Sequence, residues 1–368
     1  MKFAVIKLGA RIANENQGIS SFEAVVVSKM LSIGGNKVDC FTKVSSKDAP
    51  IEGLNVLDIT ENYTKISGNY DALVVLNGNI NFFGGVETPE QLLNLNIINN
   101  FDGKVFYIFV DTALPLRNVW ESVKAKPWGV NYLEKDILIT RKDIIYVTIS
   151  YNTGAVKDIT EKTGINPAKV VYFPFEKYVF FNDRLESVGD KSIDLLYGAN
   201  SFRPKREKKM VQFYYGLPDD IDVEFYGKMK PSDFNIKNTG NKRIPRFNNT
   251  PLKYSENLTY INRGICTLNI SDTFNEGKVL NPRIYETVLA NTISFIDHEY
   301  DPRKKAFSSP KLQDFLYVRS QRELVEKIKK LKVDKVFMLD IIKEQFDNSY
   351  ISKEDISNQF SSLMCSLI

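Results

Sequence analysis

The sequence predicts an α/β protein made of two domains, each built on a parallel sheet. Short apolar, β-branched segments alternate with segments of helical periodicity in both halves of the chain, as is typical of parallel α/β folds. The 368 residues exceed the usual size of a single hydrophobic core. A polar stretch at 182–191 separates the two runs of this alternation and is expected to be a linker. We therefore expect one domain over 1–180 and a second over 190–350.

In the first half, short apolar runs predict strands at 3–8, 38–42, 72–76, 105–110 and 144–149. An apolar helix is expected between the first two, because Ser20 and Ser21 suit its start and Gly34 and Gly35 suit its end. These elements predict a βαβ unit at the amino terminus.

In the second half, the same criteria predict strands at 193–197, 223–226, 265–270 and 292–296. Helices are expected at 206–215, 283–290 and 321–331. A terminal amphipathic helix at 353–368 is expected to pack back on the first domain. The stretch 228–250 is rich in Asn, Pro, Lys and Arg and has no periodicity, so it predicts a long mobile loop.

The composition excludes several classes of protein. With 43% hydrophobic and 26% charged residues, the chain is expected to be globular, neither disordered nor membranous. No apolar run approaches the roughly 18 residues that cross a bilayer. The amino terminus resembles a strand rather than a signal peptide, which predicts a cytoplasmic location. Three widely spaced cysteines and one histidine argue against a disulfide framework and against a zinc site.

The net charge of +4 is too small to identify a nucleic-acid partner by itself. Cations are concentrated locally, at 205–209, 242–246 and 303–305 and at Lys124 and Lys126. Each cluster suits either a solvated surface or a contact with DNA phosphates.

Asp111 directly follows an apolar strand and precedes Pro115, which prevents the strand from continuing. Ligands of open α/β sheets bind outside the carboxyl ends of strands, so Asp111 is placed where a catalytic base could stand. The alternative is that Asp111 caps the following turn or helix.

Neither half contains a G-x-G-x-x-G or G-x-x-x-x-G-K-[ST] motif. Instead, small residues and arginines at 198–206 lie between a strand and a helix and could cradle a pyrophosphate. Arg283 and Glu286 are three residues apart and share a helical face. They form either a surface salt bridge or a pair that binds phosphate and ribose.

Taken together, these residues resemble the DNA β-glucosyltransferase family of T-even bacteriophages, inverting glycosyltransferases of the two-domain GT-B architecture. Matching stretches occur in the same order along nearly the whole chain, at 80–85, 106–115, 126–128, 172–176, 201–207 and 283–287.

The resemblance implies that Asp111 deprotonates the hydroxymethyl group of 5-hydroxymethylcytosine, whose oxygen then attacks the anomeric carbon of a UDP-sugar. The cytosine is expected to be flipped out of the duplex. The resemblance also assigns residues to UDP, to the sugar and to the base or DNA. The residues assigned to UDP are Ser201, Arg203, Arg206, Gly227, Arg283 and Glu286. Those assigned to the sugar are Glu23 and Glu176. Those assigned to the base or DNA are Asn81, Phe82, Phe83, Lys124, Lys126, Lys242, Arg243 and Arg246.

The family further implies a monomer that modifies double-stranded phage DNA in the infected bacterium and protects it from host nucleases. It implies no membrane partner and no obligatory cofactor, with Mg²⁺ or Mn²⁺ at most assisting UDP release. The chain departs from the family pattern at Ala113, at Pro204 and in a loop before Glu23 that is one residue longer. Glucose is the expected sugar. A donor such as UDP-arabinose, another hydroxylated base, and a DNA-binding protein without catalysis remain alternatives.

Overall fold

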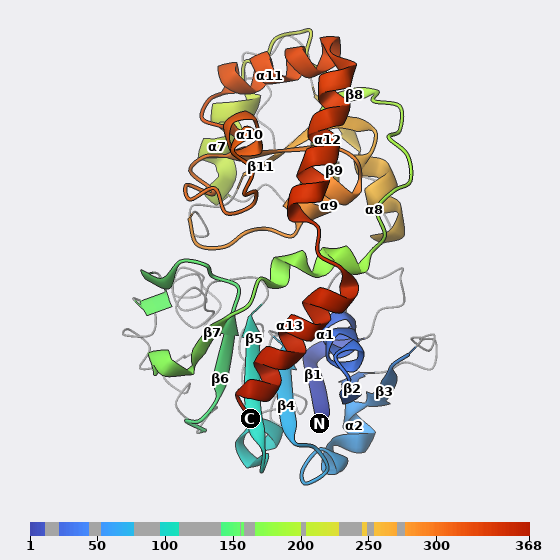
Figure 1. The fold of residues 1–368 in the computed structure, drawn as a ribbon, viewed down its shortest axis with the longest axis vertical. Coiled ribbons are helices and arrows are strands. Elements are labelled where there is room, and N and C mark those ends of the chain that lie inside the picture. Colours follow the sequence, from blue (N-terminus) through green and yellow to red (C-terminus); the bar gives the residue numbers. More distant parts are fainter. Residues whose placement is uncertain are drawn as a thin grey trace. The chain divides into compact units, whose positions relative to one another are not determined.

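The computed structural model describes residues 1–11, 22–43, 53–76, 96–109, 141–154, 156–157, 166–199, 204–227, 245–248, 254–270 and 277–368. The chain divides into two compact units. The first unit comprises Met1–Tyr178 and Ser352–Ile368, and the second comprises Val179–Ile351. Figure 1 shows a sheet with packed helices in each unit.

The first unit contains a seven-stranded sheet in the order β3-β2-β1-β4-β5-β6-β7. Every neighbouring pair is parallel. The central strands are apolar because both faces are covered: every residue of β4 is buried. The strands are β1 (Lys2–Arg11), β2 (Lys37–Lys43), β3 (Asn55–Asp58), β4 (Ala72–Leu76), β5 (Lys104–Phe109), β6 (Ile145–Thr148) and β7 (Val170–Tyr172).

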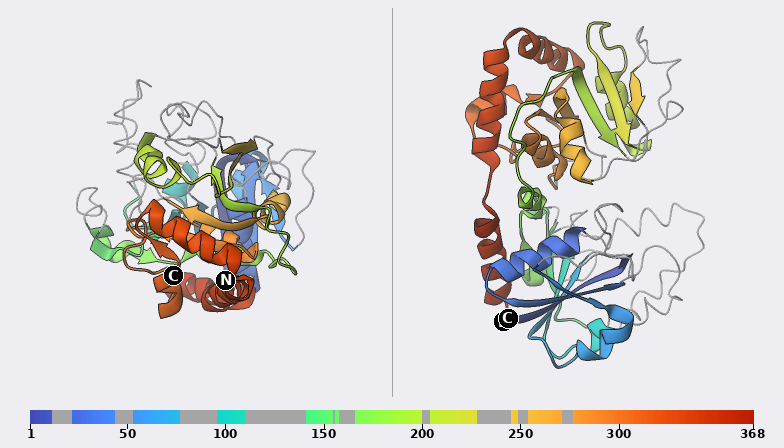
Figure 2. Two further views of the ribbon diagram at one scale, coloured as in Figure 1. Left: turned by 90° about the horizontal axis from the view of Figure 1, so that it is seen from above. Right: turned by 90° about the vertical axis from the view of Figure 1, so that its right-hand side faces the viewer.

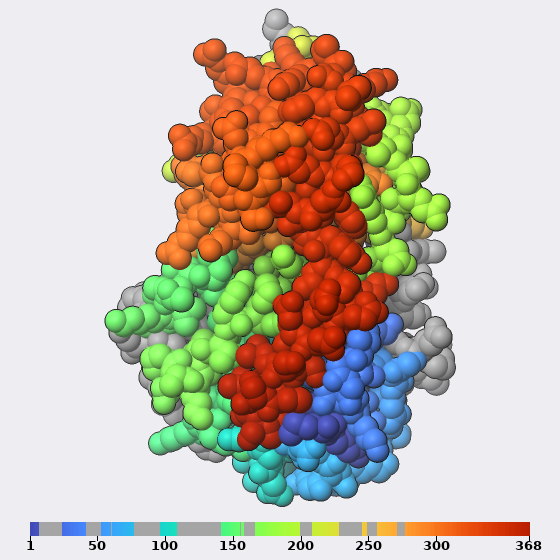
Figure 3. All heavy atoms as spheres, viewed as in Figure 1, coloured from blue at the N-terminus to red at the C-terminus, as the bar shows by residue number. Residues whose placement is uncertain are grey.

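Two helices that are distant in sequence, α1 (Phe22–Ile33) and α13 (Lys353–Ser366), lie side by side on one face of this sheet (Figures 2 and 3). Gly34 permits the close approach, because a Cβ added there would lie 2.3 Å from the Cβ of Ser361. The Ser361 hydroxyl also donates to the Gly34 carbonyl at 3.2 Å. Phe360 packs edge to face on Phe173, with ring centroids 4.8 Å apart. Shorter helices of this unit are α2 (Ile59–Asn62), η1 (Tyr63–Lys65) and η3 (Pro167–Lys169), and η4 (Phe175–Phe181) runs into the second unit.

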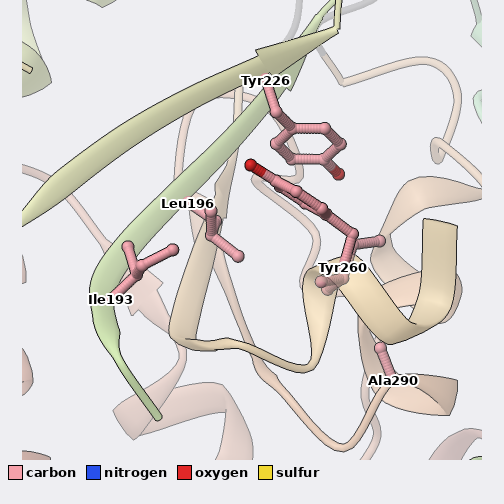
Figure 4. Packing of buried hydrophobic residues seen from close by; sticks show 6 residues of the cluster. Ile193, Leu196, Tyr226, Tyr260 and Ala290 are labelled. Atoms are coloured by element: carbon pink, nitrogen blue, oxygen red, sulfur yellow. The ribbon is translucent and has the colours of Figure 1, made fainter. Parts of the chain in front are cut away.

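The second unit contains a six-stranded parallel sheet in the order β10-β9-β8-β11-β12-β13. Leu196, Tyr226 and Tyr260 belong to a cluster of buried apolar side chains in this unit (Figure 4). The strands are β8 (Ile193–Ala199), β9 (Val223–Gly227), β10 (Arg246–Asn248), β11 (Gly264–Asn269), β12 (Ile293–Asp297) and β13 (Tyr317–Val318), and the helices are α7 (Pro204–Tyr214), α8 (Tyr254–Ile261), α9 (Arg283–Leu289), α10 (Pro310–Phe315), α11 (Gln321–Val333) and α12 (Lys335–Ser349).

In both sheets the strand order reverses beside the first strand of the unit. In the first sheet, β2 and β3 lie on one side of β1, and β4 lies on the other. In the second sheet, β9 and β10 lie on one side of β8, and β11 lies on the other. Such a reversal is the topological switch point at which open α/β sheets bind ligands. Each unit is therefore a Rossmann-like α/β fold with a defined binding edge.

The predicted fold class is confirmed, and so are the nine predicted strands, whose ends agree to within three residues. The prediction that 228–250 is entirely a loop is wrong, because Arg246–Asn248 forms β10 and pairs with Glu224–Tyr226 of β9. Residues 182–191 are irregular, as expected of a linker, but they are fixed to the second unit. Lys191 Nζ donates to the Asn262 and Asn291 carbonyls at 2.7 and 2.9 Å.

None of the helices in the described ranges combines the length and the apolar character that a membrane span requires.

Candidate active site

The predicted site residues of the first unit follow the carboxyl ends of its strands. Glu23 is the second residue of α1, which is the first helix after β1. β5 ends at Phe109, two residues before Asp111. Glu176 lies in η4, which follows β7. Because the strands are parallel, these ends share one edge of the sheet, where ligands of this fold class bind.

Many of the predicted residues lie outside the part of the chain that the structure describes, and their roles stay predictions. The helix backbone at Glu23 and Arg206 is described, but their side chains are not. The residues outside the described ranges are Asn81, Phe82, Phe83, Asp111, Lys124, Lys126, Ser201, Arg203, Lys242 and Arg243.

Glu176 is a buried carboxyl group, with the residue only 3% exposed. Its Oε2 atom has no hydrogen-bond partner among the described residues. Burial raises the pKa of Glu176 to about 8, and the nearby charge of Lys177 only partly opposes this shift. A carboxyl group with this pKa is largely protonated at pH 7, so it can both donate and accept hydrogen bonds. This chemistry suits a polar ligand such as a sugar hydroxyl.

Arg283 and Glu286 occupy the first turn of α9. The Arg283 backbone N–H donates to Asn281 Oδ1 at 2.9 Å, and its Nη1 donates to the carbonyl of Gly198 on β8. Burial raises the pKa of the Glu286 carboxyl, and the charge of Arg283 opposes that shift. The structure therefore gives the pair a defined position and is at odds with a freely solvated salt bridge.

Two threonines fix the position of α9 on the sheet. Thr287 Oγ1 donates to the Arg283 carbonyl at 2.8 Å and lies 3.1 Å from Thr267 Oγ1 on β11. Since β11 and β8 flank the switch point, the Arg283–Glu286 pair is held at the binding edge of the second sheet. A guanidinium and a carboxylate in this arrangement can bind phosphate and ribose hydroxyls.

Gly227, also predicted to bind UDP, ends β9 with a φ of +103°, a conformation that strongly favours glycine. It pairs with Ala199 at the end of β8. Next to it, Tyr226 pairs with Gly198, the first residue of the predicted pyrophosphate cradle, and sequence reasoning did not single out Tyr226. The contact depends on strand register, which the local sequence does not reveal.

Comparison with known proteins relates the chain to one family. The family model described as bacteriophage T4 beta-glucosyltransferase matches residues 1–179. The DNA beta-glucosyltransferase of Enterobacteria phage T4 is 27% identical over 351 residues, which cover 94% of each chain. The chain is similar to the T4 β-glucosyltransferase family.

The similarity to T4 β-glucosyltransferase extends to the three-dimensional structure. A solved structure of T4 phage BGT in complex with UDP and Mn²⁺ aligns with a TM-score of 0.69 and 25% identity, covering 100% of this chain and 97% of that one. WaaG, a glycosyltransferase involved in lipopolysaccharide biosynthesis, aligns with a TM-score of 0.56 and 11% identity, covering 98% of both chains, which supports the fold alone. The expected GT-B class, with its two Rossmann-like α/β units, is confirmed.

Arg246, which the resemblance to the T4 β-glucosyltransferase family places at the DNA, also has partners within the protein. Its Nη2 lies 2.5 Å from Asp222 Oδ2, and its Nε lies 3.5 Å from Glu224 Oε2. The side chain is 47% exposed. Its positive charge is thus balanced by carboxylates, and its contact with DNA stays a prediction.

Proposed function

We propose that the protein transfers glucose from UDP-glucose to the hydroxymethyl group of 5-hydroxymethylcytosine in double-stranded DNA, with inversion at the anomeric carbon. The observation that carries this proposal is the relationship to a DNA beta-glucosyltransferase over 94% of both chains, because it spans both units. The placement of Arg283 and Glu286 at a switch point supports it.

In the proposed reaction, the Asp111 carboxylate accepts the proton of the hydroxymethyl group as its oxygen attacks the anomeric carbon. The new bond joins that oxygen to the sugar, and the bond between the anomeric carbon and the UDP oxygen breaks. Arg203, Arg206 and Arg283 stabilise the negative charge that develops on the departing diphosphate. Glu286 accepts hydrogen bonds from the ribose hydroxyls.

Glu23 and Glu176 are proposed to bind the hydroxyl groups of the sugar. The buried Oε2 of Glu176 without a partner in the described residues is consistent with this role, since buried polar atoms usually have one. The target cytosine is proposed to be extruded from the duplex, at a cost of a few kcal/mol, beside Asn81, Phe82 and Phe83. Lys124, Lys126, Lys242, Arg243 and Arg246 are proposed to contact the DNA.

The proposed transfer step uses no divalent cation. Within the described ranges, no group of three or more His, Cys, Asp or Glu side chains could hold a metal ion. We propose that transfer has no obligatory cofactor and that Mg²⁺ or Mn²⁺ assists the release of UDP. If EDTA lowers the multiple-turnover rate but leaves the single-turnover rate unchanged, the metal acts on the release of UDP and not on transfer.

We also propose that the enzyme acts as a monomer on phage DNA in the infected bacterium, where the added sugar protects that DNA from host nucleases.

Mass spectrometry of hydroxymethylated duplex DNA incubated with a panel of UDP-sugars tests the proposal. The expected product carries one hexose mass per modified cytosine, and a duplex with unmodified cytosine is the control. Ala113 and the longer loop before Glu23 depart from the family pattern, so UDP-arabinose belongs in the panel. A product that carries only a pentose would overturn glucose as the donor, and no addition from any donor would overturn the enzymatic function.

A further inference from the structure

Tyr226 lies against the backbone of Gly198 at the binding edge of the second unit. The two residues are register partners on β9 and β8. A Cβ added at Gly198 would lie 2.4 Å from Cζ and 2.6 Å from Oη of Tyr226. The hydroxyl end of the phenol therefore occupies the space that any larger residue at position 198 would need.

Arg283 reaches the same glycine. Its Nη1 donates to the Gly198 carbonyl, so the guanidinium and the phenol meet at one peptide. Burial raises the pKa of Tyr226, the charge of Arg283 opposes this shift and the charge of Glu286 adds to it. The electrostatic effects show that Tyr226 is close to both members of the proposed nucleotide-binding pair.

The Tyr226 hydroxyl differs from that of its neighbour Tyr260. The two rings are in contact, with centroids 5.0 Å apart and planes tilted by 42° (Figure 4). The Tyr260 hydroxyl donates to Glu224 Oε1 and accepts from Asn248 Nδ2 at 2.7 Å. Tyr226 is only 7% exposed, yet its hydroxyl forms no hydrogen bond with another described residue. The hydroxyl is therefore available to donate a hydrogen bond to a ligand near Gly198.

We propose that the Tyr226 hydroxyl donates a hydrogen bond to the diphosphate of the nucleotide, beside the guanidinium of Arg283. This inference rests on the proposed function, which places a UDP-sugar at this edge. A diphosphate is the appropriate acceptor, because its charge is attracted to Arg283 and because a hydroxyl group can donate to an anionic oxygen. Tyr226 would thus be a nucleotide-binding residue in addition to those that the family resemblance assigns.

The test is calorimetric binding of UDP and of uridine to the wild-type protein, Tyr226→Phe and Tyr260→Phe. Tyr226→Phe removes only the hydroxyl group and is expected to weaken UDP binding by about 10- to 100-fold, the range for a hydrogen bond to a charged group. Uridine binding is expected to stay unchanged, because uridine has no diphosphate. Tyr260→Phe is the matched control, with UDP affinity expected to equal that of the wild type. Thermal unfolding of each variant verifies that it is folded.

Wild-type UDP affinity in Tyr226→Phe would overturn the inference and leave the proposed function intact. Equal losses for UDP and uridine would overturn the contact with the diphosphate. A wild-type protein that binds no UDP would overturn the proposed function and this inference with it.

Discussion

Arg283 donates a hydrogen bond to the backbone carbonyl of Gly198 and thereby joins the first turn of α9 to the end of β8. β8 precedes β11 in the sequence and α9 follows it, but the two elements meet at the same edge of the sheet. The guanidinium has further donors beyond the one that this bond uses. It can therefore be positioned by the fold and still bind an anion.

Removing either member of the α9 pair should weaken UDP binding. Arg283→Ala and Glu286→Ala are each expected to cost about 1 to 3 kcal/mol in UDP binding, the range for a lost hydrogen bond to a charged group. Calorimetry measures this effect. Arg322→Ala is the control, because Arg322 is 88% exposed and pairs with Glu326 on the surface. Wild-type affinity in both α9 variants would reduce the pair to a structural role.

Asp111→Asn should abolish transfer while UDP affinity stays nearly constant. The amide keeps the shape of the side chain but does not accept the proton, and loss of a general base typically costs on the order of 10² to 10⁴ in rate. Single-turnover transfer to hydroxymethylated DNA measures the chemical step. A variant that keeps more than about a tenth of the wild-type rate would show that another group is the base.

Glu176 should make the folded protein less stable as the pH rises. Its pKa is raised from 4.5 to about 8, so between these values the folded state binds more protons than the unfolded state. Stability then falls as the pH rises through this window and levels off above it. Glu176→Gln should remove this pH dependence and gain a few kcal/mol at pH 9, since each pKa unit corresponds to about 1.4 kcal/mol.

Denaturant unfolding of the wild type and Glu176→Gln at pH 5, 7 and 9 measures this difference. The exposed Glu61 supplies a matched control, Glu61→Gln, which should leave the pH dependence of the wild type unchanged. Parallel curves for the wild type and Glu176→Gln would contradict the raised pKa.

The buried amine of Lys209 should be important for stability. Its Nζ lies 2.6 Å from Asp297 Oδ2 and 2.6 Å from Glu299 Oε2, and the side chains of Lys209 and Asp297 are 2% and 1% exposed. Lys209→Met leaves Asp297 buried without its cation, which typically costs about 3 to 5 kcal/mol. Lys343→Met breaks a surface pair with Asp347 and should have little effect. Equal losses in the two variants, measured by denaturant unfolding, would contradict this prediction.

DNA binding should depend on salt through the basic residues between β9 and β10. Each phosphate contact contributes about 0.9 to the slope of log affinity against log salt, so Lys242→Ala with Arg243→Ala should reduce the slope by about 2. Arg246→Ala alone should change it much less, because Asp222 and Glu224 already balance that charge. Fluorescence anisotropy with labelled duplex measures the slope. An unchanged slope in the double variant would assign these cations to a solvated surface.

The strands that the sequence did not predict share one property. β3 and β7 are the edges of the first sheet, and β10 and β13 are the edges of the second. An edge strand is covered less completely, so it lacks the apolar run that identifies a central strand. β3, β7 and β10 contain no buried residue, and β13 has only two residues.

The candidate site was predictable where its chemistry is local. Arg283 and Glu286 are recognisable from their spacing on a helix, and the wider set stays a prediction from the resemblance to a known family. Tyr226 was not predictable, because its contact with Gly198 depends on how β9 pairs with β8. The burial of Glu176 likewise depends on how the chain packs around η4. A glutamate beside aromatic residues in the sequence does not indicate that packing.

The packing of α13 on α1 has a consequence for the order of events on the ribosome. The first unit includes Ser352–Ile368, which are synthesised only after every residue of the second unit. Until they emerge, the nascent first unit lacks the partners of Gly34 and Phe173 and exposes the face of α1 that α13 covers. Although domains generally fold in the order of synthesis, the amino-terminal unit of this protein is completed last.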